Sequence, residues 1–213
     1  MPNWTYNNTQ IKGNKVDVAN FLNIIKGKDD KGEYYYDFTK CNPMPVELEN
    51  LHQGARTIDG VTVDTWYEDG NEVRPMMDMV KDRLLKEYKT YRPIDWQYNN
   101  WGTKWGDCQT ELLSDETVDD IRTLEFYFES AWGEPFRLLN DMAIKFNLEI
   151  ENKWDIELGN GDGISSYPWT PEDTERVYQE FEDDMNSMRE SIRKLWVIYI
   201  NMLMKLVNKI PIV

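Results

Sequence analysis

A repeating apolar pattern near the carboxyl end constrains the fold of this chain more than any other feature. Between residues 178 and 206, large apolar side chains recur at alternating intervals of three and four, the heptad spacing of a helix that packs along one seam. Thr170 can cap such a helix and Pro171 suits its first position, so the sequence predicts a long helix over residues 170–208. The seam consists of Phe181, Met185, Met188, Ile192, Leu195, Tyr199, Met202 and Leu206.

This helix would be about 57 Å long at the usual helical rise, which exceeds what a small sheet can cover. We therefore expect the seam to pair between protomers and the chain to be a homo-oligomer. The alternative is a helix that packs only along its own sheet. A membrane span is not expected, because Asn201, Lys205 and Lys209 interrupt an apolar run that is already too short.

Residues 1–165 alternate between strand and helix patterns. Their order of strand, helix, two strands, helix and strand predicts an α+β fold, specifically a ferredoxin-like antiparallel sheet with helices on one face. Residues 46–74 form an excursion from this domain, with a hairpin about Asp59-Gly60. Residues 96–105 are expected to be a connection, and Gly159 to Gly163 a turn. The expected strands span about 4–13, 108–113, 124–129 and 150–158, and the expected helices about 16–25, 75–91 and 135–146.

The charge of the chain is strongly negative and confined to one region. The formal net charge is −15, while residues 101–190 alone hold 23 acids and 7 bases. Such a surplus repels phosphate backbones, so general nucleic-acid binding is not expected. Acidic runs are usually solvated surface, but here they also allow an acidic face that meets a basic partner or imitates nucleic acid.

No motif for catalysis, a cofactor or a metal is present. The chain has one histidine, His52, and two cysteines, Cys41 and Cys108, too few for a zinc site or a disulfide framework. A Cys41–His52 nucleophile pair lacks an orienting third group, and no spacing singles out a carboxylate pair for magnesium or paired-acid chemistry. We expect a non-enzymatic, cytosolic protein without cofactor or metal.

A tryptophan-rich segment is the best candidate for a ligand site. Its aromatic faces, amides and lysine suit the stacking of a base and the holding of its phosphate. The alternative is that these indoles only close the edge of the sheet. The candidate ligand-binding residues are Trp96, Asn100, Trp101, Thr103, Lys104 and Trp105.

Four landmarks follow one another along residues 1–160. They are Met1-Pro2-Asn3-Trp4 with Asn8 and Gly13, Phe38-Thr39-Lys40 with Pro43-Met44-Pro45, the stretch from Asn100 to Cys108, and Phe128 to Trp132 before Pro135. Together they resemble the YubB-type ferredoxin-like domain family of phages, prophages and plasmids. The resemblance implies a ferredoxin-like fold and a mobile-element origin, and it supplies no catalytic residues. The chain departs from the family pattern by its long excursion and its carboxyl-terminal helix.

A mobile-element origin favours an accessory role against host defence. The first hypothesis is a counter-defence protein that sequesters a host ligand such as a signalling nucleotide at subunit junctions. The alternative is an acidic inhibitor or DNA mimic that occupies a basic groove of a host defence protein. Metal-dependent degradation of a nucleotide is a third possibility, which no motif predicts.

Overall fold

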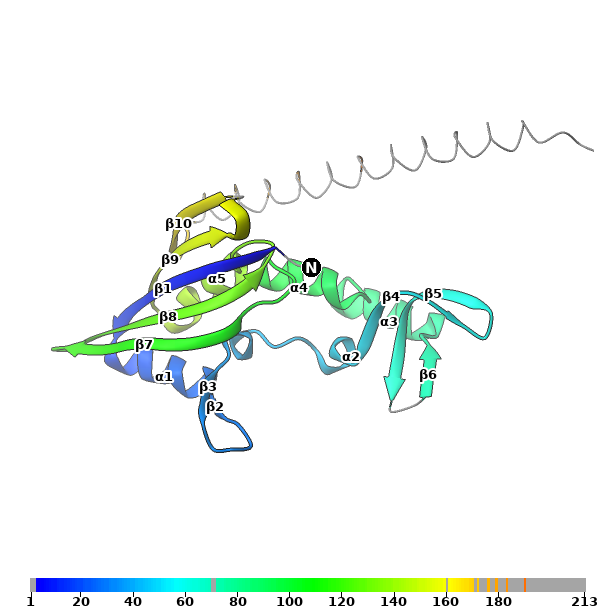
Figure 1. The fold of residues 1–213 in the computed structure, drawn as a ribbon, viewed down its shortest axis with the longest axis horizontal. Coiled ribbons are helices and arrows are strands. Elements are labelled where there is room, and N and C mark those ends of the chain that lie inside the picture. Colours follow the sequence, from blue (N-terminus) through cyan, green and yellow to red (C-terminus); the bar gives the residue numbers. More distant parts are fainter. Residues whose placement is uncertain are drawn as a thin grey trace, which may run out of the picture. The chain divides into compact units, whose positions relative to one another are not determined.

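The computed structural model describes residues 3–69, 72–159 and 161–170, together with single positions further along the chain (Figure 1). Contacts divide the chain into two units, Met1–Pro168 and Trp169–Val213. The first unit combines helices with antiparallel sheets, so the α+β prediction is confirmed.

The predicted oligomerisation seam from Phe181 to Leu206 lies outside the described residues, as does most of the predicted helix over 170–208. Both remain predictions. None of the helices in the described part of the chain combines the length and apolar character needed to cross a membrane.

A five-stranded antiparallel sheet organises the first unit, with strand order β10-β9-β1-β8-β7. Its central strand β1 pairs with β8 on one side and β9 on the other, so that Asn8 lies opposite Tyr127 and Lys153. The strands are β1 (Trp4–Asn14), β7 (Cys108–Val118), β8 (Ile121–Ala131), β9 (Glu149–Ile156) and β10 (Gly161–Tyr167).

Helices α1 (Lys15–Ile25) and α5 (Phe136–Phe146) bury one face of this sheet. Side chains alternate between the two faces of a strand, which is why Ile11, Phe126 and Phe128 are fully buried while their neighbours in sequence are more exposed. The helices contribute Val18, Phe21, Ile25, Leu138, Leu139 and Met142 to the same core.

The described residues between α1 and β7 form two smaller sheets, three α-helices and one 3-10 helix. Strands β2 and β3 form a short ribbon, and β4, β5 and β6 form a three-stranded sheet whose β4–β5 turn is the expected one at Asp59-Gly60. The elements are β2 (Lys26–Lys28), β3 (Tyr34–Tyr36), the 3-10 helix η1 (Phe38–Cys41), α2 (Val46–Glu49), β4 (Leu51–Ile58), β5 (Val61–Asp69), β6 (Glu72–Pro75), α3 (Asp78–Tyr88) and α4 (Pro93–Trp101).

Two sequence-based expectations about elements were wrong. The expected connection over 96–105 is largely helix α4, because Pro93 occupies the first helical turn, where a missing amide costs nothing. The strand expected to be the last, 150–158, ends at Ile156 in β9, and a 3-10 turn η2 (Glu157–Gly159) leads into the further strand β10.

Candidate functional site

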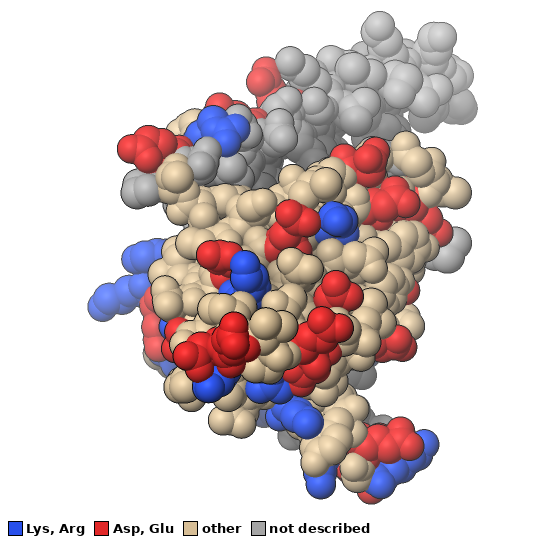
Figure 2. All heavy atoms as spheres, turned by 90° about the vertical axis from the view of Figure 1, so that its left-hand side faces the viewer, with Lys and Arg blue, Asp and Glu red and all other residues tan. Residues whose placement is uncertain are grey.

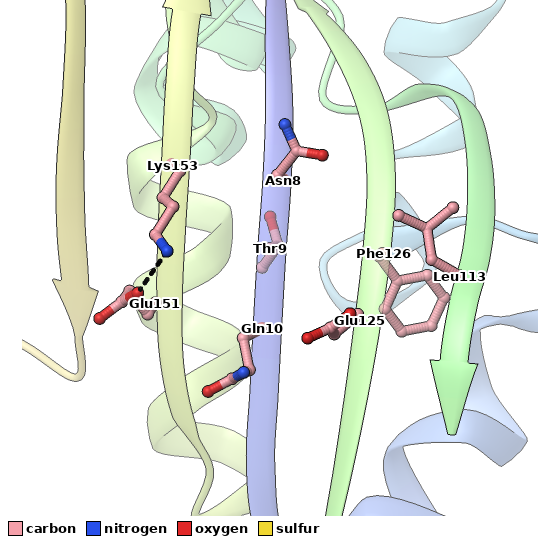
Figure 3. A pocket seen from close by; sticks show the side chains of 8 residues that line it. All are labelled: Asn8, Thr9, Gln10, Leu113, Glu125, Phe126, Glu151 and Lys153. Carbon is pink, nitrogen blue, oxygen red and sulfur yellow. Dashed lines mark ion pairs between the residues drawn. The ribbon is translucent and has the colours of Figure 1, made fainter. Parts of the chain in front are cut away.

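Helices α1 and α5 lie on one face of the five-stranded sheet, and no other helix of the described residues covers the opposite face, which we call the open face. Along β1, Thr5, Asn7 and Thr9 are buried on the helix side, whereas Asn8 and Gln10 are exposed on the opposite side. Figure 3 shows this face, with helices behind the strands and the side chains of Asn8 and Gln10 in front.

Carboxylates dominate the open face. Glu125 on β8 and Glu151 on β9 lie opposite Gln10 on the central strand. The lysines that the strands place among these acids are Lys12 and Lys153. Strand pairing assigns eight carboxylates to this face: Glu111, Glu116, Glu125, Glu129, Glu149, Glu151, Asp155 and Asp162.

The two lysines neutralise little of this charge. Lys12 Nζ lies 3.8 Å from Glu149 Oε2, and Lys153 Nζ lies 3.6 Å from Glu151 Oε1. Both pairs are exposed to solvent, where an ion pair contributes at most about 1 kcal/mol. The open face therefore keeps a negative potential suited to cationic groups.

A shallow hollow lies at the centre of the open face, with a volume of about 170 Å³ (Figure 3). Amide and carboxylate groups converge on it from β1, β8 and β9, so it can accept hydrogen bonds from a donor-rich group. Its lining residues are Asn8, Thr9, Gln10, Leu113, Glu125, Phe126, Glu151 and Lys153.

Aromatic side chains gather at the end of the open face where β1 begins. The Trp4 ring centroid lies 5.6 Å from that of Trp105, and Lys104 Nζ lies 4.8 Å from the Trp105 centroid. Tyr6 follows Trp4 on the same side of β1, and Tyr127 lies diagonally across on β8. These four rings are partly exposed, so they can contact a bound molecule.

The surroundings of Tyr127 on the open face raise its pKa. Its hydroxyl donates to Glu129 Oε1 at 3.0 Å, and Gln109 Nε2 donates to Glu129 Oε2 at 3.3 Å. Desolvation, followed by the hydrogen bond to Glu129, raises the pKa of Tyr127 to about 12. Tyr127 therefore stays a neutral hydroxyl at every physiological pH.

Two of the six predicted ligand-binding residues, Trp96 and Trp101, belong to the hydrophobic core. Each is only 6% exposed, and their rings meet edge to face with centroids 5.5 Å apart. Trp101 Nε1 donates to the carbonyl of Asn42 at 2.8 Å. The alternative interpretation, in which the indoles have a structural role at the edge of the sheet, is thus closer to what is found, although both indoles lie in the core on helix α4.

Two further predicted residues also have structural partners. Asn100 Nδ2 donates to the carbonyl of Trp96 at 2.8 Å, and the buried Thr103 hydroxyl donates to the carbonyl of Ala131. Only Lys104 and Trp105 reach the end of the open face. The six residues are thus not brought together around one cavity.

Sequence reasoning did not include Trp4, Tyr6, Tyr127 and Glu129 among the candidate site residues. The signal was present, because residues 4–9 and 124–129 alternate in character and each strand has one aromatic or acidic side. Which side faces solvent follows from strand pairing, which a single sequence does not give.

The acidic run at the β7–β8 hairpin lies apart from the hollow and is partly paired. Arg122 Nη2 lies 2.6 Å from Asp115 Oδ2, and Lys15 Nζ lies 2.6 Å from Asp120 Oδ1. Figure 2 shows acidic side chains over much of the face visible there, interspersed with lysines and arginines. This run matches the solvated-surface interpretation more closely than the open face does.

The two residues considered for nucleophilic chemistry have different surroundings. Burial raises the pKa of the Cys41 thiol to about 12, so the thiol stays neutral and unreactive. His52 stacks on Trp66 in the three-stranded sheet, with ring centroids 6.0 Å apart. Within the described ranges, no group of three or more histidine, cysteine and acidic side chains is placed to hold a metal ion.

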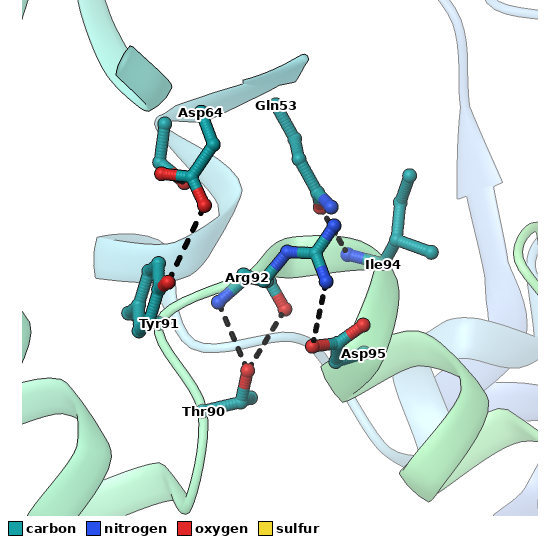
Figure 4. A network of polar contacts seen from close by, with 8 residues as sticks. Gln53, Asp64, Thr90, Tyr91, Arg92, Ile94 and Asp95 are labelled. Atoms are coloured by element: carbon teal, nitrogen blue, oxygen red, sulfur yellow. Dashed lines mark hydrogen bonds and ion pairs between the residues drawn. The ribbon is translucent and has the colours of Figure 1, made fainter. Parts of the chain in front are cut away.

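A polar network connects the three-stranded sheet to the junction of α3 and α4 (Figure 4). Gln53 Oε1 accepts the amide of Ile94 at 3.3 Å, and the Tyr91 hydroxyl donates to Asp64 Oδ2 at 3.3 Å. The network fixes the start of α4.

A second hollow of about 380 Å³ is lined by Ala55, Thr62, Val63, Asp64, Thr65, Met76, Asp78 and Lys81.

Together these features define an α+β protein with an acidic sheet face that is aromatic at one end and that no described helix covers. No model of a known protein family matches the chain, and no curated protein matches it. Among solved structures, it is similar to the crystal structure of a protein api92 from Yersinia pseudotuberculosis, described with the family model DUF1281. The identity is 10%, the TM-score is 0.41, and the match covers 78% of this chain and 94% of that one. This similarity is too low to transfer a fold or function, and membership of the YubB-type family stays a prediction.

Proposed function

We propose that this chain is a non-enzymatic binding protein whose open face holds a basic surface of another protein. The observation that supports this proposal is the ratio of eight carboxylates to two lysines on a sheet face that the helices leave uncovered. A face with one sign of charge attracts and orients a partner of the opposite sign.

We also propose that the fold is ferredoxin-like. The succession β1-α1-β7-β8-α5-β9 repeats the βαββαβ order of that fold, and the antiparallel strand order β9-β1-β8-β7 supports the assignment. Strand β10 extends the sheet at the β9 edge.

The biological setting of the proposal comes from the YubB-type resemblance. We propose an accessory protein of a phage or other mobile element that acts in the bacterial cytoplasm, where its partner is a host defence protein with a basic groove. This deepens the acidic-inhibitor hypothesis drawn from the sequence.

Sequestration of a small host ligand such as a signalling nucleotide remains a second candidate. The observation that favours it is the position of Lys104 beside the partly exposed Trp4–Trp105 pair, which provides a cation next to aromatic faces. The burial of Trp96 and Trp101 removes two of the expected stacking faces, so we place this candidate second.

A charge-removal variant tests the first proposal. The triple variant Glu125→Gln, Glu151→Gln and Asp155→Asn removes three charges from the open face and leaves the side-chain shapes nearly unchanged. Binding of a basic probe protein such as cytochrome c, measured by titration calorimetry, should weaken roughly tenfold at low salt. Wild-type binding itself should weaken steeply as sodium chloride rises.

The matched control removes three acids from other elements through Asp30→Asn, Glu33→Gln and Asp82→Asn. These side chains are exposed in the β2–β3 turn and in α3. The control should bind the probe within about twofold of wild type, since the net charge change is the same and only its place differs. Equal weakening in both triple variants would assign binding to overall charge and refute a role for the open face.

A further inference from the structure

The aromatic end of the open face combines rings with carboxylates that have no cationic partner among the described residues. Tyr6 lies at the centre of this group, because strand pairing places Glu129 on β8 and Asp155 on β9 directly opposite it. Tyr127 stands one diagonal step away, and its pKa is affected by both Tyr6 and Glu111. We call these five residues the Tyr6 patch.

The carboxylates of the Tyr6 patch differ in their availability. Glu129 already accepts hydrogen bonds from Tyr127 and Gln109. The side chains of Glu111 and Asp155 make no hydrogen bond or ion pair with any residue in the described ranges. Asp155 lies opposite Tyr6 and Glu111 opposite Tyr127, so each tyrosine has a carboxylate acceptor for a ligand beside it.

This combination distinguishes between the two basic side chains that a protein partner can offer. The guanidinium of arginine is planar, stacks on aromatic faces and donates two parallel hydrogen bonds to a carboxylate. The ammonium of lysine is compact and strongly hydrated, and it gains less from a ring beside an acid. Lys104 already places a cation beside the Trp105 ring. The part of this end that can bind a cation from a partner is therefore centred on Tyr6.

We propose that the Tyr6 patch binds arginine side chains of a basic protein segment, with a guanidinium stacked on Tyr6 or Tyr127 and paired with Asp155 or Glu111. This inference rests on the proposed function, a basic protein partner, and specifies the chemistry by which that partner is recognised. The occupant is favoured by charge complementarity with the eight carboxylates of the open face.

Fluorescein-labelled nona-arginine and nona-lysine peptides test the proposal by fluorescence anisotropy on the full chain at low salt. Nona-arginine should bind about three- to tenfold more tightly, the difference expected of one or two stacked guanidinium groups. Tyr6→Leu should bring the two affinities close together and leave nona-lysine binding within about twofold. Tyr6→Phe keeps the ring and should keep the preference.

Two carboxylate variants distinguish the contribution of the Tyr6 patch to peptide binding from that of the rest of the open face. Asp155→Asn should reduce nona-arginine binding more than nona-lysine binding, because it removes a bidentate acceptor. Glu125→Gln, which lies opposite Gln10 outside the patch, should weaken both peptides alike and leave their ratio unchanged. Circular dichroism melting of each variant checks that the sheet is intact.

The outcomes distinguish the two proposals. Equal affinities for the two peptides, unaffected by Tyr6→Leu, would overturn arginine recognition while leaving a basic partner in place. Failure of wild type to bind either peptide at low salt would overturn both proposals. A preference for nona-arginine that Tyr6→Leu and Asp155→Asn remove, and Tyr6→Phe retains, supports arginine recognition.

Discussion

Asp107 shows how a single buried acid holds two parts of the chain together. Its carboxylate accepts the amides of Phe38 at 2.9 Å and Thr39 at 3.3 Å, and the hydroxyl of Thr110 at 2.7 Å. These bonds attach the start of η1 to the loop before β7. Phe38 then packs on Phe126 in the core, with ring centroids 5.2 Å apart.

The titration of Asp107 makes the stability of the protein depend on pH. Burial raises its pKa to about 6, above the ordinary value of 3.8. The folded protein thus binds this proton more tightly than the unfolded chain does. The contribution of Asp107 to the free energy of unfolding is greatest below about pH 4 and falls as the pH rises through about 6.

Asp107→Asn should be destabilised by about 1 to 3 kcal/mol, because the amide nitrogen of asparagine accepts no hydrogen bond, whereas both oxygens of a carboxyl group, protonated or ionised, can accept one. Urea unfolding of both proteins between about pH 4 and 7 measures the difference. The advantage of wild type should shrink as the pH rises through this window. An advantage that grows with pH would mean that the pKa of Asp107 is lowered, contrary to this account.

The residues of the candidate site were only partly predictable from the sequence. Trp105 and Lys104 were predicted to contact a ligand, and the structure places them at the aromatic end of the open face. Trp96 and Trp101 were grouped with them by proximity in sequence, but helix α4 turns both indoles into the core. Proximity along a helix does not fix which side of it faces solvent.

At the scale of elements, the alternation of side chains predicted most strands. It failed where glycines, which have no side chain, interrupt the alternation. The strand over 124–129 was evident from its strict alternation and is the middle part of β8. Strand β10 was missed because Gly161 and Gly163 occupy its inward positions and give no alternating signal. Helix α4 was not predicted because residues 96–105 were expected to be a connection, although Pro93 stands at the start of a helix.

The end of α4 provides an element-scale test. Gly102 caps this helix with a φ of 84°, and a Cβ atom there would lie 2.7 Å from the Phe136 ring. Gly102→Ala should lower the free energy of unfolding by about 2 to 4 kcal/mol, from the positive φ and the clash together. Urea unfolding monitored by tryptophan fluorescence measures the loss.

Gly32 offers a matched control in the β2–β3 turn. Its φ is 82°, but no atom lies within 4 Å of the added Cβ. Gly32→Ala should therefore cost only about 1 kcal/mol, the backbone penalty alone. Similar losses in the two variants would show that packing of Phe136 against the end of α4 contributes little.

At the scale of the whole molecule, acids from one region of the sequence lie together on one surface, the open face. The 23 acids of residues 101–190 include all eight carboxylates of the open face, since β7, β8, β9 and β10 all come from this region. The sequence showed where the charge lies along the chain. Its collection on one side of a sheet depends on strand register, which composition does not determine.

The predicted assembly also belongs to this scale. The heptad seam predicts that the chain is a homo-oligomer, and Ile192→Asp places a charge in the middle of that seam. Multi-angle light scattering should show a wild-type mass that is a multiple of 25.4 kDa and a lower mass for the variant. A wild-type mass of one chain, or an unchanged mass in the variant, would remove the seam from any assembly.

The edge strand β7 limits how copies of this protein can meet. Its pairing with β8 is irregular at two places, between Cys108 and Glu111 and between Leu112 and Ser114. Such bulges interrupt the row of outward amides and carbonyls that would otherwise guide an incoming strand, and the acids Asp115 and Glu116 repel an identical edge. The β7 edge of the sheet is thereby protected against growing into a continuous ribbon with its neighbours, even at high protein concentration.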